Sequence, residues 1–336
     1  MSEKALFLVK SAKTPSSRIR ICELAPYLAD HDIEYEIEYI PKNLFSRLKL
    51  LKKAADFDLV MFQKRLLPNL EFRELRRNAK ILGFDFDDAV FHKNASPSAN
   101  YKDYISPTRE RRFTRIIKNI DFAIAANSYL ASKTAEFAPD TKIEILPSSV
   151  DTDTLEHKED YTLSEPPSAG WVGTQVTHRF LEYLAPAFRE LRRKTDFELR
   201  VISDKDLLLE GLNVKNIRWS RETENCEIRR FDIGIMPLSD DPYARGKASY
   251  KLLQYMAAGV PSIASAVGMN REVAGSNEFA LLAESADEFP AAMEKLFADI
   301  ALRKKLGKNG RKKIEREFSR DIVGHRFAEI IASRIK

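Results

Sequence analysis

Short apolar, β-branched runs alternate with amphipathic stretches along almost the whole chain. This alternation is typical of βαβ units, in which parallel strands form a sheet and amphipathic helices cover its faces. It occurs twice among the 336 residues, once in each half. Doubly wound sheets bind ligands beyond the carboxyl ends of their strands, so two of them face to face would form a binding cleft. The sequence therefore predicts an α/β protein with two Rossmann-like domains.

The predicted strands are short and fall into two groups of six. Those of the first half are expected at residues 5–9, 33–40, 59–63, 80–85, 122–125 and 143–146. Those of the second half are expected at residues 169–172, 198–202, 217–219, 233–236, 262–264 and 279–282. The amphipathic periodicity predicts helices at residues 17–28, 44–53, 71–78, 178–193, 251–258, 286–299 and 319–336.

The pattern is interrupted between the two halves. The segment Pro147-Ser-Ser-Val-Asp151 is followed by a polar, acidic stretch, 155–168, which ends in Glu165-Pro-Pro-Ser168. Polar, proline-containing stretches of this kind are typical of linkers between domains. We therefore expect a first domain over residues 1–155 and a second over residues 166–316.

Composition excludes several classes of protein. With 44% hydrophobic and 31% charged residues, the chain is neither disordered nor collagen-like. Two cysteines, Cys22 and Cys226, are too few for a disulfide framework or a structural zinc site. The N-terminus lacks the pattern of a signal peptide, and no stretch approaches the roughly 20 apolar residues of a membrane span. A cytoplasmic location is the expectation.

The net charge of +5 lies entirely in the first half, because residues 1–150 contain 25 basic and 20 acidic residues and the remainder contains 30 of each. Segment 42–53 has five basic residues and no acid, interleaved with leucines and Phe45. Such a basic amphipathic helix suits an anionic membrane surface, and residues 109–118 could extend the patch. A core-packed helix with a solvated basic face explains the segment equally well. No nucleic-acid-binding module is present, so nucleic acid is not an expected partner.

The stretch 231–272 is the most informative for function. A hydrophobic strand leads through an acidic loop to Arg245-Gly246-Lys247-Ala-Ser249, and a helix follows that carries Lys251 and ends at Gly259. Unpaired N–H groups and the positive end of the helix dipole would meet these cations, which suits a diphosphate. A solvated basic turn on an ordinary αβ unit is the alternative.

This stretch resembles the donor-binding segment of glycosyltransferase family 4, the retaining sugar transferases of the GT-B fold. Three further segments are similar to that family: Leu146-Pro-Ser-Ser-Val-Asp151 at the end of the first domain, Gly170-Trp-Val-Gly173 at the start of the second, and Phe318-Ser319 before the last helix. The resemblance implies a GT-B fold in which the final helix, 317–336, crosses back to the first domain. It also implies a nucleotide-sugar donor bound by the second domain, a glycan or lipid-linked acceptor bound by the first, and a metal-independent reaction without a cofactor.

Two departures from the family affect the expected site. The family's Glu-x7-Glu pair corresponds to Gly246 and Gln254, of which only the glutamine can still hydrogen-bond a hydroxyl. The loop after Gly173 lacks the usual arginine and lysine. We therefore expect the diphosphate to meet Arg245, Lys247 or Lys251, together with N–H groups at Gly173–Thr174 and Ala248–Ser249. Gln254 and Glu272 are expected to orient the sugar or ribose.

Three carboxylates, Asp85, Asp87 and Asp88, come at or directly after a predicted strand of the first half. One interpretation has Asp87 or Asp88 contact the acceptor hydroxyl or the donor sugar, with His92 close enough to share the site. A structural capping role is the second interpretation, since aspartate favours such positions. A metal-binding DxD motif is the third, against which the GT-B resemblance argues.

The first strand is followed by Pro15-Ser-Ser-Arg18-Ile-Arg20, which opens a predicted helix. Ser17 and Arg18 are placed there to bind an acceptor phosphate, and a plain serine cap with surface arginines is the equal alternative. Nothing in the sequence resembles a hydrolase or metalloprotease motif.

The predicted function is transfer of a sugar from a nucleotide-diphosphate donor to an acceptor with retention of configuration. Arg245 and Lys247, with the helix N-terminus near Ser249, would stabilise the departing diphosphate. The alternatives are a nucleotide-sugar 2-epimerase on the same fold and a non-catalytic protein that binds sugar nucleotides or glycans.

Overall fold

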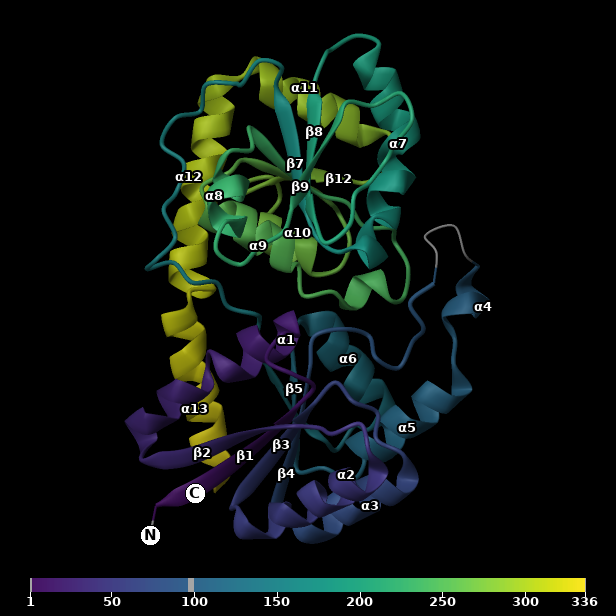
Figure 1. The fold of residues 1–336 in the computed structure, drawn as a ribbon, viewed down its shortest axis with the longest axis vertical. Coiled ribbons are helices and arrows are strands. Elements are labelled where there is room, and N and C mark those ends of the chain that lie inside the picture. Colours follow the sequence, from purple (N-terminus) through teal and green to yellow (C-terminus); the bar gives the residue numbers. More distant parts are fainter. Residues whose placement is uncertain (1, 96–99, 336) are drawn as a thin grey trace.

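The computed structural model describes residues 2–95 and 100–335. Its first sheet has six parallel strands in the order β2-β1-β3-β4-β5-β6 (Figure 1). The strands are β1 (Glu3–Val9), β2 (Ile33–Tyr39), β3 (Leu59–Gln63), β4 (Ile81–Phe86), β5 (Phe122–Ala125) and β6 (Lys142–Ile145). The chain reverses its winding direction between β1 and β3, so the carboxyl ends of these two strands flank the point where doubly wound sheets bind ligands.

The second sheet repeats this architecture with the order β12-β11-β10-β7-β8-β9. Its parallel strands are β7 (Ser168–Val172), β8 (Glu198–Ser203), β9 (Val214–Arg218), β10 (Ile233–Met236), β11 (Ser262–Ser265) and β12 (Leu281–Ala283). The winding reverses between β7 and β10. The predicted α/β class with two doubly wound sheets is confirmed.

Helices cover both sheets (Figure 1). The longer ones are α2 (Leu44–Lys52), α3 (Asn69–Asn78), α5 (Pro107–Ile117), α6 (Ser128–Phe137), α7 (Arg179–Arg192), α9 (Tyr250–Ala257), α11 (Glu288–Ala298), α12 (Ile300–Glu317) and α13 (Arg320–Ile335). Among the described residues, none of the helices combines the length and the apolar character that crossing a bilayer requires.

The single helix predicted over 17–28 is wrong. The chain forms a three-residue turn α1 (Pro15–Ser17), a π-helical turn η1 (Arg18–Cys22) and a 3-10 helix η2 (Ala25–His31). Pro26 explains the break, because it has no N–H to donate to the carbonyl of Cys22 and its ring crowds the preceding turn.

The last two helices span both halves of the molecule (yellow in Figure 1). Helix α12 packs on α9 of the second half, whereas α13 packs on η2 of the first. Phe327 and Ile331 of α13 are buried in the cluster that contains Phe7 of β1. Each such buried side chain contributes about 1.5–3 kcal/mol, so the C-terminal helix is held firmly against the first sheet.

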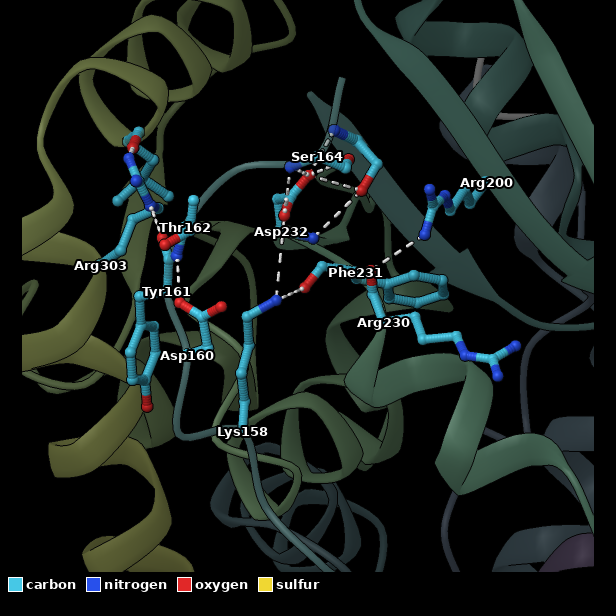
Figure 2. A network of polar contacts seen from close by, with 12 residues as sticks. Lys158, Asp160, Tyr161, Thr162, Ser164, Arg200, Arg230, Phe231, Asp232 and Arg303 are labelled. Atoms are coloured by element: carbon cyan, nitrogen blue, oxygen red, sulfur yellow. Dashed lines mark hydrogen bonds and ion pairs between the residues drawn. The ribbon is translucent and has the colours of Figure 1, made fainter. Parts of the chain in front are cut away.

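The segment between β6 and β7 has no regular secondary structure, and Figure 2 shows how it is attached to the second half. The buried Asp232 carboxylate accepts hydrogen bonds from the backbone and hydroxyl of Ser164 and of Ser168, at 2.6–3.2 Å. Lys158 donates to the carbonyl of Phe231 at 2.9 Å. The domain boundaries drawn from the sequence stay predictions, but this segment packs against the second sheet rather than running free.

Candidate functional site

A cavity of about 410 Å3 lies between the two sheets. Its lining comes from both halves: Lys13, Pro15, Arg18, Asp87, Asp88, Val172, Gly173, Thr174, Thr177, Asp204, Trp219, Glu224, Met236, Lys247, Ala248, Ser249, Tyr250, Lys251 and Gln254. Many of these residues follow directly after a strand, as Asp87 does after β4, Gly173 after β7 and Trp219 after β9. The cavity is therefore where two doubly wound sheets are expected to bind a ligand.

An acidic wall of the cavity is formed by Asp87 and Asp88. The ammonium of Lys64 joins them, at 2.8 Å from Asp87 Oδ1 and 2.5 Å from Asp88 Oδ2. Lys64 follows β3 and has a left-handed backbone, with φ of 55°. Burial would lower the pKa of Lys64, but the two carboxylates outweigh it and raise that pKa. Lys64 therefore stays charged.

The two carboxylates themselves are perturbed in opposite directions. Burial raises the pKa of Asp87. Burial acts the same way on Asp88, but the cations Lys64 and Lys247 outweigh it and lower the pKa of that carboxyl. Asp88 is thus held as a carboxylate, whereas Asp87 is the better proton acceptor of the pair.

Asp85, the third carboxylate expected at the cleft, lies elsewhere. It belongs to β4 and is buried, where Arg20 Nη2 donates to its Oδ1 at 2.6 Å and Gln63 Nε2 donates to its Oδ2 at 2.9 Å. Because side chains alternate across a strand, Asp85 points away from the face that carries Phe84 and Phe86 and toward Arg20 of η1. Arg20 forms a buried ion pair with Asp85, so it is not a surface arginine.

The opposite wall carries two lysines of the second half. Lys247 Nζ lies 3.7 Å from Asp88 Oδ1, while Lys251 Nζ lies 5.3 Å from the centre of the Trp171 ring. Lys251 makes no hydrogen bond or ion pair to any other described residue. Burial, together with the charge of Lys247, lowers the pKa of Lys251 to about 7. The Lys251 ammonium therefore has no counter-ion among the residues described, and an anionic ligand in the cavity would supply one.

Backbone donors reach the cavity at the N-terminus of α9. Ser249, its N-cap, has a left-handed backbone and donates its hydroxyl to Asn270 Oδ1 at 2.7 Å. The N–H groups of Ala248 and Ser249 have no partner among the described residues. In contrast, the N–H of Gly173 donates to Ile202 at 2.9 Å and that of Thr174 to Thr177 Oγ1 at 3.3 Å. Of the N–H groups expected from the sequence to meet the diphosphate, those of 248–249 are therefore the ones without a partner in the described part of the chain.

Two further lining residues offer groups for a larger ligand. Gln254 is buried on α9 and reaches the cavity. The indole of Trp219 is 41% exposed, and its Nε1 donates to Glu224 Oε1 at 2.8 Å. Exposed aromatic faces of this kind stack well on nucleobases.

Four residues assigned to the site from the sequence do not line the cavity. Arg245 is paired with Asp240 at 2.6 and 2.9 Å, Glu272 accepts from Ser128, and Ser17 is buried. Gly246 packs against the first half instead. The structure brings the remaining nine together: Arg18, Asp87, Asp88, Gly173, Thr174, Lys247, Ser249, Lys251 and Gln254.

Arg18 lines the cavity but its Nη1 also donates to Glu23 Oε1 at 2.9 Å. His92 lies outside the cavity and is buried. Across the described residues, no three His, Cys, Asp or Glu side chains gather into a metal site. Metal independence stays a prediction.

Sequence reasoning missed Lys64, Asp204 and Trp219. Each directly follows a strand: β3, β8 and β9 respectively. Because the carboxyl ends of parallel strands meet at one edge, a list of residues just beyond each predicted strand would have included Lys64 and Asp204. Trp219 would have been missed, because it is the last residue of the strand predicted over 217–219. None of them belongs to a recognisable motif.

Residues 166–299 match the family described as Glycosyl transferases group 1. A comparison with curated proteins found no match. The solved structures that are similar over almost their whole length include the three that follow. Sucrose-phosphate synthase from Thermosynechococcus elongatus has a TM-score of 0.74 at 14% identity, over 98% of this chain and 99% of that one.

A glycosyltransferase from Rickettsia africae has a TM-score of 0.73 at 16% identity, over 100% of this chain and 99% of that one. The Anabaena protein HepE in complex with UDP has a TM-score of 0.73 at 14% identity, over 98% and 100%. Identities this low establish the fold alone, which is GT-B, as the resemblance implied. With the family match in the second half, they support a GT-B glycosyltransferase.

Proposed function

We propose that the protein transfers a sugar from a nucleotide-diphosphate donor, held in the 410 Å3 cavity, to a glycan or lipid-linked acceptor with retention of configuration. The observation that carries this proposal is the Lys251 ammonium beside Lys247, together with the N–H groups of Ala248 and Ser249, all without a hydrogen-bond or ion-pair partner among the residues that the structure describes. Together they form a diphosphate-sized set of donors. Because the Anabaena protein of this fold is described in complex with UDP-glucose, UDP-sugars are the first donors to test.

Each wall of the cavity has a part in the proposed reaction. The bond between the anomeric carbon and the diphosphate oxygen breaks, and Lys247 and Lys251 stabilise the charge that develops on the leaving group. A new bond forms to the acceptor oxygen, whose proton passes to the Asp87 carboxylate. Asp88 keeps Lys247 in place, and Trp219 supplies a face for the nucleobase. A closed cavity limits donor hydrolysis by water.

Product analysis tests the proposal and separates it from its rivals. Purified protein is incubated with UDP-sugars and candidate acceptors, and the products are identified by mass spectrometry and NMR. Released UDP with an α-configured product from an α-configured donor supports retaining transfer. An isomerised donor would indicate a 2-epimerase, and donor binding without turnover would indicate a sugar-nucleotide-binding protein.

The diphosphate assignment has its own test in Lys247→Ala. We expect weaker UDP binding or slower turnover, because a charged hydrogen-bond donor at the leaving group is lost. Lys312→Ala, at an exposed position on α12, is the matched control for removing a lysine. Wild-type donor affinity and rate in Lys247→Ala would remove the assignment.

We also propose that the start of α2 touches an anionic membrane, where a lipid-linked acceptor would reside. Phe45 is 82% exposed at the first turn of α2, and Lys42, Lys49 and Lys52 are exposed around it. Lys53 differs from them because it is paired with Glu36 and Glu38. An exposed aromatic ring among free lysines suits the interface of anionic lipids.

Flotation with phosphatidylserine vesicles tests this contact. Changing Lys42, Lys49 and Lys52 to serine should release the protein from the vesicles, whereas Lys53→Ser is the control that should float like the wild type. Equal flotation of the wild type and the triple variant would refute the membrane proposal. A cytoplasmic location remains the expectation from the sequence.

A further inference from the structure

The two halves of the molecule touch along a seam beside the cavity. We define the seam by Ala89 and 127–130 on the first half and by 242–248 on the second. Ala248 packs into the hydrophobic cluster of the first half, and the hydroxyl of Tyr129 donates to the carbonyl of Pro242 at 3.3 Å. The loop that carries Lys247 is therefore attached to the opposite domain.

Gly246 permits a close approach of the two halves at this seam. A Cβ at position 246 would lie 2.8 Å from the backbone nitrogen and from the Cβ of Ala89, and 3.0 Å from Leu130 Cδ2. The backbone of Ala89 cannot move aside to relieve such a clash, as the end of a flexible side chain could. Any side chain at this position would force the two halves apart, so the seam depends on a glycine.

Asn127 joins the two halves by hydrogen bonds. Its Oδ1 accepts from the N–H of Leu130 at 2.9 Å, which caps α6 within the first half. Its Nδ2 donates across the seam to the carbonyls of Gly246 at 3.2 Å and of Lys247 at 3.1 Å. Asn127 is only 1% exposed. Its amide therefore accepts and donates these hydrogen bonds where little water can reach.

These contacts place Lys247. Asn127 holds the carbonyl of Lys247 at the seam, while the ammonium of Lys247 lies 3.7 Å from Asp88 Oδ1 inside the cavity. The backbone of one residue is thus fixed by the first half, and the side chain of the same residue faces the cavity. Separation of the halves would remove both contacts together.

We infer that Asn127 is a positioning residue, which holds Lys247 in the donor cavity by fixing its loop across the seam. This inference rests on the proposed function of the cavity. Only an amide serves here, because a cap acceptor and a donor to two carbonyls are needed at once. An aspartate would keep the cap but would set a carboxylate against two carbonyl oxygens.

Asn127→Asp is therefore the sharpest substitution, since it preserves size and cap and abolishes the donation across the seam. Asn43→Asp is the matched control, because Asn43 caps α2 by accepting from Phe45 and Ser46 and makes no contact across the seam. Gly246→Ala opens the seam from the other side. It tests the inference even where Asn127→Asp fails to fold.

The measurements are UDP affinity by calorimetry and the radius of gyration by X-ray scattering. We expect Asn127→Asp and Gly246→Ala to weaken UDP binding about 10-fold, as loss of one or two buried hydrogen bonds predicts, and to enlarge the unliganded protein. Asn43→Asp should behave as the wild type. Wild-type affinity and dimensions in either seam variant would overturn the inference.

A double-mutant cycle separates positioning from a merely structural role. In a Lys247→Ala background, Asn127→Asp should cost little further UDP affinity, because the group that it positions is gone. Full additivity of the two effects would refute the positioning role. Failure of the wild type to bind UDP at all would instead refute the proposed donor, and scattering would still report on the seam.

Discussion

The unpaired Lys251 predicts an unusual pH dependence for donor binding. Its side chain is half-buried beside the Trp171 ring and lies near Lys247, and its pKa falls to about 7. A diphosphate placed beside it would favour the charged form and raise that pKa. Binding therefore favours the protonated form of Lys251, and the free protein loses this proton as the pH rises above 7.

The size of the effect follows from the fraction of protein that carries the proton. With a pKa of about 7, roughly half of the free protein is protonated at pH 7 and about 1% at pH 9. Affinity for UDP should thus fall about 50-fold between these two values, provided that the bound pKa lies above 9. The terminal phosphate of UDP is already largely ionised in this range, since such groups lose their last proton near pH 6.

Calorimetry at pH 7, 8 and 9 measures this decline, and repetition in buffers of different ionisation enthalpy counts the protons taken up. Lys251→Met keeps most of the length of the side chain and removes the ionisable amine. At pH 7 we expect it to bind UDP about 10- to 150-fold more weakly, as loss of a charged hydrogen bond predicts. Its affinity should stay flat up to pH 9. Equal declines in the wild type and in Lys251→Met would refute the reasoning.

Three further outcomes are expected. Trp219→Ala should weaken UDP binding by about 5- to 150-fold, the range for loss of one stacked base, and Trp219→Phe should restore most of it; calorimetry that shows no change in either would argue against stacking. Arg20→Ala should lower the free energy of unfolding in urea by about 3–5 kcal/mol, because it leaves the Asp85 carboxylate buried without its partner; a change below 1 kcal/mol would show that water replaces the guanidinium. Excess EDTA should leave the rate of UDP release unchanged, and a loss that Mg2+ or Mn2+ restores would contradict metal independence.

The strands that could be predicted best are those buried on both faces. The bounds expected for β3, β5 and β10 are the bounds observed, since the residues of these central parallel strands are all buried and the strands have no solvent-exposed polar face. β9 was expected over 217–219 and forms over Val214–Arg218. It is an edge strand in which no residue is fully buried, so its apolar run is too short to mark its limits.

The site was harder to predict because it depends on loop conformation. In the sequence, Arg245 and Lys247 lie on the same predicted turn, and either could bind a phosphate. The structure distinguishes them, because Arg245 finds Asp240 within its own loop and Lys247 faces Asp88 of the other half. Such a choice depends on a partner distant in sequence, which no local pattern reports.

Gly246 shows the same limit from another side. In the sequence, Gly246 stands where the family that this chain resembles has a glutamate, and the only apparent consequence is the loss of a negative charge. The structure gives it a packing reason, since Ala89 leaves no space for a Cβ. The close contact between the two halves therefore explains why this position has no carboxylate.

The seam and Lys251 are connected through Lys247, whose charge helps to lower the pKa of Lys251. Opening the seam in Asn127→Asp would move that charge away and admit water, and both changes raise the pKa of Lys251. The decline of UDP affinity with pH should then begin at a higher pH in Asn127→Asp than in the wild type, although binding at pH 7 is weaker. Asn43→Asp should keep the wild-type profile. A seam variant that binds more weakly with an unchanged pH profile would show that Lys247 had not moved, and Asn127 would then act on the donor by another route.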